Sequence, residues 1–163
     1  MEKIKLNNGI QMPVFGIGTF RIEPDDAEKS VEFALKNGYR LIDTANAYMN
    51  ERAVGRGIRK SGIPREEIFV STKLWPSLYE DDKAVDKTIE RLGLDFIDLL
   101  FIHQPTSNWK EGYKQLEKAY KDGKIKSIGI SNFEEKYIEE LLQTCEIKPQ
   151  VIQVEAHPYF TQE

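Results

Sequence analysis

The stretch YRLIDTANAY, residues 39–48, begins as an apolar strand and ends on polar groups. Asp43 closes the apolar part, and Tyr48 follows five residues later. Two later stretches have the same ending, because EIFVSTK (residues 67–73) stops on a lysine and DLLFIH (residues 98–103) stops on a histidine. Three successive apolar runs that end on three different titratable side chains indicate a sheet whose strand ends carry a site.

The rest of the chain alternates between short apolar runs and amphipathic stretches. A hairpin is predicted first, over residues 2–14 around the turn Asn8-Gly9. The six predicted strands lie within residues 14–20, 39–45, 67–74, 95–103, 125–133 and 149–157. Helical patterns follow the first five of them, at about residues 25–36, 51–60, 80–91, 108–121 and 134–144. Strands that alternate with helices of this length predict βαβ crossovers and a parallel sheet.

Two parallel architectures compete for this pattern. A doubly wound dinucleotide-binding fold needs G-x-G-x-x-G in its first βα turn, but the stretch GIGTFR (residues 16–21) has Arg21 in place of the third glycine. An eight-stranded (β/α)8 barrel places functional residues at the C-terminal ends of several strands. The polar strand ends favour the barrel.

The residue types at these strand ends suit one chemical task. Neighbouring strands lie about 4.8 Å apart, so Asp43, Lys73 and His103 are expected within roughly 10 Å of one another, with Tyr48 on a loop beside them. An ammonium group near the phenol is expected to lower the phenol's pKa from about 10 toward the working range. Asp43 would hold Lys73, and His103 would orient a carbonyl oxygen. The set is suited to protonating an oxygen while hydride adds to the carbon.

At these positions the sequence resembles the aldo-keto reductase family. The resemblance is carried by GIGTF (16–20), LIDTANAYMNERAVGRGI (41–58), STKLW (71–75), DLLFIHQP (98–105), GKIKSIGISNF (123–133) and QVEAHPY (153–159). It implies an NADPH-dependent reductase of aldehydes and ketones, with Asp43, Tyr48, Lys73 and His103 as catalytic tetrad and Tyr48 as general acid. The wording of the motifs is most similar to the bacterial diketogluconate and methylglyoxal reductase-like branch.

The same resemblance implies further contacts. The cofactor-binding residues would be Gly18, Thr19, Asp43, Ser131, Asn132 and Gln153. Phe20 and Trp75 would line an apolar substrate opening together with Tyr48 and His103, and Trp109 of the fourth βα loop would stand beside them. No metal site is predicted. Each of these residues taken alone also fits an ordinary role, such as a helix cap, a solvated strand end or a packing aromatic, and only their joint spacing favours the site.

Composition narrows the possible partners and the location. The 163 residues include 23 basic and 27 acidic side chains in mixed order, which gives no case for binding nucleic acid or an anionic membrane. Cys145 is the only cysteine, and the first residues lack the apolar core of a signal peptide. A cytoplasmic protein is therefore expected, and the resemblance implies a small carbonyl compound as its substrate.

The predicted barrel is incomplete. Residues 1–163 form a single truncated domain with six of eight strands, because a complete barrel takes about 250 residues. In the family, the segment that binds the cofactor phosphates would come with strands seven and eight, which these residues do not include. Cofactor binding and activity of the isolated chain are therefore expected to be weak. Two alternatives stay open: an inactive interaction module that completes its sheet by self-association through unpaired strand edges, and a barrel lyase that uses Lys73 as a Schiff-base nucleophile.

Overall fold

The structure is a computed structural model that describes residues 2–106 and 108–162. Its centre is a parallel sheet of six strands in the order β3-β4-β5-β6-β7-β8. Their bounds are Ile17–Gly18, Leu41–Asp43, Phe69–Leu74, Leu99–Ile102, Ile128–Ser131 and Val151–Gln153. Spatial order follows chain order throughout, which is the strand arrangement of a (β/α)8 barrel rather than of a doubly wound sheet.

In the described parts of the chain, five α-helices connect the strands, as predicted. Their bounds are α1 Pro24–Lys36, α2 Glu51–Ser61, α3 Ala84–Leu92, α4 Trp109–Lys121 and α5 Glu135–Thr144. Short 3-10 turns occupy Asn46–Tyr48, Arg65–Glu67 and Pro76–Leu78. Helix α3 starts four residues later than expected. Residues 76–83 instead form the connection from β5: they include the 3-10 turn Pro76–Leu78, and the Asp81 side chain accepts a hydrogen bond from the Lys83 backbone N–H at 3.1 Å.

The sheet buries two different faces. Even-numbered side chains such as Val70, Leu100 and Ile130 point to the helices and form the main core, which extends from α1 to α5. From β4 to β8, odd-numbered side chains point to the opposite face, where Phe69, Leu99 and Phe101 form a smaller cluster. The parity is reversed in β3, where Ile17 pairs with Ile42 and packs on the main core. This alternation is the period of two that all strands have. It places the odd-numbered polar residues at the strand ends on one common face.

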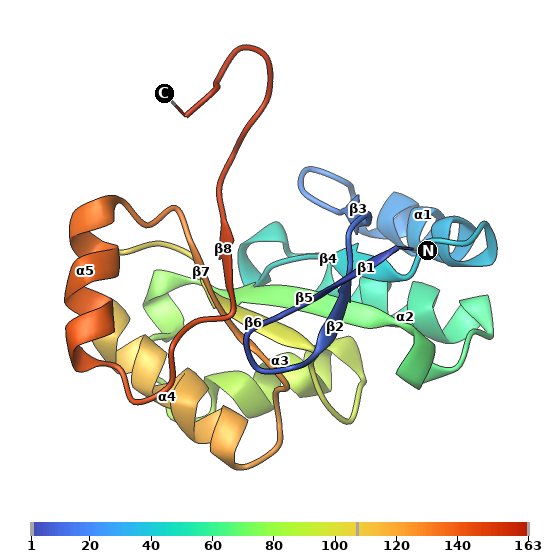
Figure 1. Cartoon of the computed structure of the whole chain (residues 1–163). Helices are drawn as coiled ribbons and strands as arrows, with labels where there is room; N and C mark the ends of the chain where they lie inside the picture. The colour runs from blue at the N-terminus through green and yellow to red at the C-terminus, as the bar shows by residue number, and fades with distance from the viewer. Residues whose placement is uncertain (1, 107, 163) are drawn as a thin grey trace.

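The N-terminal hairpin covers the start of that face. Strands β1 (Lys3–Lys5) and β2 (Gln11–Pro13) pair antiparallel, and Ile10 and Met12 pack on the smaller cluster. The Asn8 side-chain amide donates to the carbonyl of Lys126 at 3.0 Å, just before β7. Figure 1 shows the hairpin in front of the sheet, with α3 and α4 below the sheet in this view. The hairpin thus closes the N-terminal ends of the strands and leaves the C-terminal ends open.

Within the described residues the sheet is open at β3 and β8, each of which has one neighbouring strand. Beyond β8 the chain leaves the sheet and extends away from it (Figure 1). Ile152, Val154 and Phe160 are exposed there, so apolar surface flanks this edge. None of the helices in the described ranges has the length and apolar character that a bilayer crossing requires.

Candidate active site

Four strand ends carry the predicted catalytic and cofactor residues. Asp43 ends β4, Lys73 lies in β5, His103 follows β6, and Ser131 ends β7. All four have odd numbers and therefore face the interior side of the sheet. The parallel register pairs Asp43 with Ser71 and Lys73 with Phe101, which keeps the strand ends level. Convergence of the site follows from strand order, register and alternation together.

A buried ion pair lies at the base of this site. The Lys73 ammonium contacts the Asp43 carboxylate at 2.6 Å and donates to the Thr44 carbonyl at 3.0 Å, and its side chain is 1% exposed. The Ser71 hydroxyl donates to the other Asp43 oxygen at 2.6 Å. Burial lowers the pKa of Lys73, and attraction to Asp43 partly offsets that effect. Asp43 therefore both positions Lys73 and favours its charged form.

Tyr48 lies above this pair on the 3-10 turn that follows β4. Its ring packs on Phe20 with centroids 5.0 Å apart, and the Lys73 ammonium is 5.2 Å from its centroid. The expected lowering of its pKa is wrong for this structure. Burial, followed by the negative charge of Asp43, raises the pKa of Tyr48 to about 12. Burial is the larger cause of the difference, and Asp43 adds to it because its negative charge opposes the field that Lys73 alone would exert on the phenol.

His103 completes the arrangement. Its ring lies edge-on to Tyr48 at 6.0 Å and to Trp75 at 5.0 Å between centroids, and the residue is 8% exposed. Burial, followed by the positive charge of Lys73, lowers the pKa of His103 to about 4. The imidazole is therefore neutral at neutral pH and carries one N–H that can donate to an oxygen. Its Nδ1 atom is buried and has no hydrogen-bond partner among the described residues.

This low pKa predicts a pH-dependent loss of stability. An unfolded histidine titrates near 6.5, so as the pH falls from 6.5 to 4 the unfolded chain binds a proton that the folded chain does not. We expect His103 to cost the folded state about 3 kcal/mol at pH 4, at about 1.4 kcal/mol per pKa unit. Urea unfolding from pH 7 to pH 4 would show a smaller loss in His103→Asn than in the wild type. The exposed His157→Asn variant serves as control, and parallel pH profiles of His103→Asn and wild type would contradict the assignment.

A cavity of about 570 Å³ opens over these residues, within the usual size of small-molecule sites. Its lining joins the predicted catalytic, cofactor and substrate residues: Phe20, Tyr48, Lys73, Trp75, His103, Ser131, Asn132 and Gln153, with Ala47, Gln104, Val154 and Glu155. Phe20 is 60% and Trp75 39% exposed, so both stand at the rim. The cavity has an apolar rim and a polar base.

The far wall of the cavity consists of polar groups at the ends of β7 and β8. The Asn132 amide side chain donates to the carbonyl of His103 at 3.1 Å and to the Ser131 hydroxyl at 3.1 Å. The Asn132 backbone has a left-handed φ of 61°, and its N–H donates to the Gln153 carbonyl at 3.0 Å. The Gln153 side-chain amide makes no hydrogen bond to another described residue, so it can bind a ligand amide.

Three predicted residues lie beside the cavity rather than in its lining. Gly18 pairs with Asp43 across β3 and β4, and the Thr19 hydroxyl donates to the Asp43 carbonyl at 3.2 Å. Thr19 is fully buried. Gly18 and Thr19 thus hold Asp43, at the end of β4, in place from the side of β3.

Trp109 is not part of the opening, which corrects the expectation for that residue. It is the first residue of α4 and is 6% exposed. Its indole packs edge-on against Phe133 at 5.2 Å and Tyr137 at 6.4 Å. The position of Trp109 in the fourth βα loop predicted a place at the rim of the substrate opening. Its side chain fills the core between α4 and α5 instead.

Sequence reasoning missed Glu51, which links the segments that carry two of the predicted catalytic residues, Tyr48 and Lys73. Its buried carboxylate accepts hydrogen bonds from the Asn46 amide at 2.9 and 3.0 Å and from the Thr72 hydroxyl at 2.7 Å, and it pairs with Arg91 at 2.7 Å. Asn46 starts the turn that carries Tyr48, and Thr72 precedes Lys73. An acidic residue in the first turn of a helix is ordinary in a sequence, so no local signal distinguished it.

Loss of this carboxylate should destabilise the fold. Glu51→Gln keeps the side-chain shape but leaves Arg91 without its partner and turns an amide N–H toward a donor, so we expect a loss of about 3 kcal/mol in the free energy of unfolding. Urea unfolding at pH 7 measures it. Glu111→Gln removes a 55% exposed partner of Lys114 and is expected to cost less than about 0.5 kcal/mol. Equal losses in the two variants would contradict a stabilising role for the contacts around Glu51.

Comparison with known proteins shows which family has this sequence and fold. Residues 14–163 match the sequence profile of the Aldo/keto reductase family. The chain is 51% identical over 166 residues to the glyoxal reductase of Bacillus subtilis and 43% identical over 165 residues to the morphine 6-dehydrogenase of Pseudomonas putida. These alignments cover 99% and 98% of this chain but 60% and 56% of the relatives.

Solved structures agree with the sequence comparison. An aldo/keto reductase from Brucella melitensis superposes with a TM-score of 0.93 at 42% identity, over 99% of this chain and 65% of that one. An aldo-keto reductase from Bombyx mori, solved in complex with NADP, superposes with a TM-score of 0.94 at 34% identity, over 99% of this chain and 60% of that one. The predicted incomplete (β/α)8 barrel is confirmed, and the chain spans about 60% of the length of the curated relatives named above.

Proposed function

The chain belongs to the aldo/keto reductase family, and we propose that its site reduces aldehydes or ketones to alcohols with hydride from NADPH. The observation that supports this most directly is one cavity lined by Tyr48, Lys73 and His103 on one side and by Ser131, Asn132 and Gln153 on the other. The relatives support a nicotinamide cofactor, since one is an NADPH-dependent aldose reductase of Saccharomyces cerevisiae and one neighbour was solved with NADP.

The polar wall fits the nicotinamide end of such a cofactor. Ser131, Asn132 and Gln153 would hold its carboxamide, since the Gln153 amide has donor and acceptor groups that no described residue uses. Gly18, Thr19 and Asp43 would flank it from the side of β3 and β4. When bound, the dinucleotide supplies the hydride that adds to the carbonyl carbon.

The chain's own residues would complete the reaction at the carbonyl oxygen. The His103 N–H would donate a hydrogen bond that orients the oxygen, and the Tyr48 hydroxyl would transfer its proton to it. A pKa of about 12 keeps Tyr48 protonated and ready to donate, and an alkoxide is a stronger base than the phenolate that remains. The Lys73 ammonium, 5.2 Å from the ring centroid, would stabilise that phenolate as it forms. Phe20 and Trp75 at the rim would exclude water.

The substrate we propose is a small aldehyde or ketone with little charge. The rim is aromatic, and the one ammonium in the described lining, Lys73, is already paired with Asp43. Glyoxal reductase among the relatives supports a short dicarbonyl compound. NADPH oxidation with glyoxal or methylglyoxal tests the proposal directly, at millimolar NADPH because weak cofactor binding is expected. Absence of turnover at that concentration with both compounds and with a simple aldehyde would overturn it.

Cofactor binding by the 163-residue chain alone is predicted to be weak. NADPH carries a pyrophosphate and a 2′-phosphate, which need cationic side chains or free backbone N–H groups. Among the described residues, the cavity lining offers only Lys73 as a cation, and the Asp43 ion pair uses it. We expect fluorescence titration with NADPH to show no saturation in the micromolar range. Micromolar binding by the purified chain would contradict this expectation.

Two other functions are separable from reduction. The open edges at β3 and β8 and the exposed Ile152 support an interaction module that self-associates, and such a module would show no NADPH oxidation that depends on Tyr48.

A Schiff-base lyase would need a free Lys73 amine, and its lowered pKa favours that role. The Lys73 nitrogen is held by Asp43 and Thr44, however, so borohydride is expected to trap no adduct on it.

A further inference from the structure

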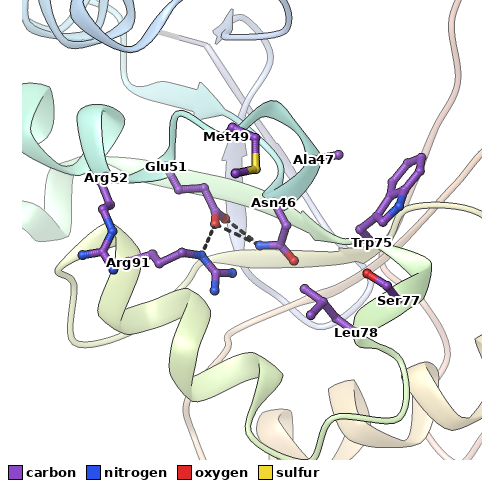
Figure 2. A pocket seen from close by; sticks show the side chains of 9 residues that line it. All are labelled: Asn46, Ala47, Met49, Glu51, Arg52, Trp75, Ser77, Leu78 and Arg91. Atoms are coloured by element: carbon purple, nitrogen blue, oxygen red, sulfur yellow. Dashed lines mark hydrogen bonds and ion pairs between the residues drawn. The ribbon is translucent and has the colours of Figure 1, made fainter.

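A second cavity lies behind the turn that carries Tyr48 (Figure 2). Its volume is about 750 Å³, and its lining is Asn46, Ala47, Met49, Glu51, Arg52, Trp75, Ser77, Leu78 and Arg91. Ala47 and Trp75 also line the catalytic cavity, so these two residues form a shared wall. We propose that this second cavity binds a small polyhydroxylated anion, such as a sugar acid or sugar phosphate.

The charge of the lining favours an anion. The lining contains two guanidinium groups, Arg52 and Arg91, and one carboxylate, Glu51, which leaves one net positive charge. Arg91 is fixed, because its Nε contacts Glu51 at 2.7 Å and one Nη donates to Thr88 at 2.9 Å. No described carboxylate forms an ion pair with Arg52, whereas Arg56, one turn further along α2, pairs with Glu28 at 2.5 Å. An immobile guanidinium beside an available one suits a carboxylate or phosphate.

An unsatisfied acceptor favours hydroxyl groups on the same ligand. The Asn46 side-chain N–H groups point to the Glu51 carboxylate, which fixes the orientation of the amide, because the reverse orientation would set oxygen against oxygen. The Asn46 Oδ1 atom is buried and has no partner among the described residues. Figure 2 shows this oxygen directed away from Glu51, on the side of Ser77 and Leu78. A buried acceptor without a donor is costly, and a ligand hydroxyl would satisfy it once the side chains that cover the oxygen move aside.

The remaining walls suit the carbon skeleton of such a ligand. Figure 2 shows Trp75 and Leu78 on the side of the cavity opposite the two arginines. Trp75 is 39% exposed and offers an apolar face for C–H groups, and Ser77 adds a hydroxyl beside it. A ligand that joins both sides would hold Asn46, two residues before Tyr48, and would thereby order the turn at the catalytic cavity.

Calorimetric titration with three five-carbon probes tests the site without cofactor or carbonyl substrate. Ribonate carries a carboxylate, ribitol 5-phosphate carries a phosphate, and ribitol carries no charge. We expect one of the two anions to bind with a dissociation constant of about 1 mM or below and ribitol to bind at least about tenfold more weakly. The anion that binds more tightly identifies the anionic group. Failure of both anions to bind, or equal binding of ribitol, would overturn the proposal.

Matched variants locate the binding. Arg52→Gln is expected to weaken the anion at least about fivefold, and Arg56→Gln, the same change one turn further along α2, is expected to leave it unchanged. Equal effects of the two variants would overturn the proposal. Binding that is lost in His103→Asn but kept in Arg52→Gln would place the anion in the catalytic cavity and would also overturn it. Because no step depends on NADPH, this result is independent of whether the chain reduces carbonyls.

Discussion

Replacing Tyr48 by phenylalanine is expected to lower kcat/KM for carbonyl reduction at least about a hundredfold, since a positioned general acid contributes roughly 10² to 10⁴ in rate. Phenylalanine keeps the ring that packs on Phe20 at 5.0 Å and lies edge-on to His103 at 6.0 Å, so the cavity keeps its shape. Only the proton donor is lost. The measurement is NADPH oxidation in the range where rate is linear in substrate, which needs no saturation.

Tyr113→Phe is the matched control for this change. Tyr113 is also buried, and its hydroxyl donates to the Ile147 carbonyl at 2.7 Å between α4 and the segment after α5, away from the cavity. That variant is expected to lose stability but to keep its kcat/KM at a temperature where it stays folded. A Tyr48→Phe variant that keeps wild-type kcat/KM would remove Tyr48 as the acid and would favour an interaction module or a different donor.

Asp43→Asn is expected to cost about 3 to 5 kcal/mol of unfolding free energy at pH 7. The change leaves the Lys73 ammonium, 1% exposed, without a charged partner in the interior, and breaking one side of a buried ion pair has a cost of that size. The loss should shrink as the pH rises toward 10.5. Burial already lowers the pKa of Lys73, and removal of the Asp43 charge lowers it further. In the variant, the unfolded lysine therefore binds a proton that the folded one has lost over a wider pH range than in the wild type, so the variant's stability increases more with pH.

A double-mutant cycle separates the ion pair from other effects of Asp43. Asp43→Asn combined with Lys73→Met removes both charges, and we expect the double variant to be more stable than Asp43→Asn alone. Asp86→Asn, which removes a 56% exposed partner of Lys124, should cost less than about 1 kcal/mol. Urea unfolding measures the wild type, the single variants Asp43→Asn and Lys73→Met, the double variant and the Asp86→Asn control. A loss for Asp43→Asn as small as that for Asp86→Asn would contradict a buried, energetically coupled pair.

Much of the fold could be predicted because its signals are local. Apolar runs, helical periodicity and the glycines that follow α1 to α4 depend on neighbouring residues, and Gly62 and Gly93 do end α2 and α3 with left-handed φ values of 70° and 63°. The position of Asp43, Lys73 and His103 at successive strand ends also follows from the sequence. Parallel βαβ units place such ends at one edge, and alternation by two puts odd-numbered side chains on one face.

Other features depend on groups that are distant in the chain. Burial and the opposing charge of Asp43 set the pKa of Tyr48, and helix packing directs Trp109 into the core rather than the rim. Glu51 gains its role only because Asn46, Thr72 and Arg91 meet around it, and the second cavity exists only between those elements. The sequence by itself determined which residues stand at each strand end, because strand and helix periods are local properties. Only the tertiary structure decided their electrostatics and neighbours, because desolvation and contact depend on what the rest of the chain packs against each group.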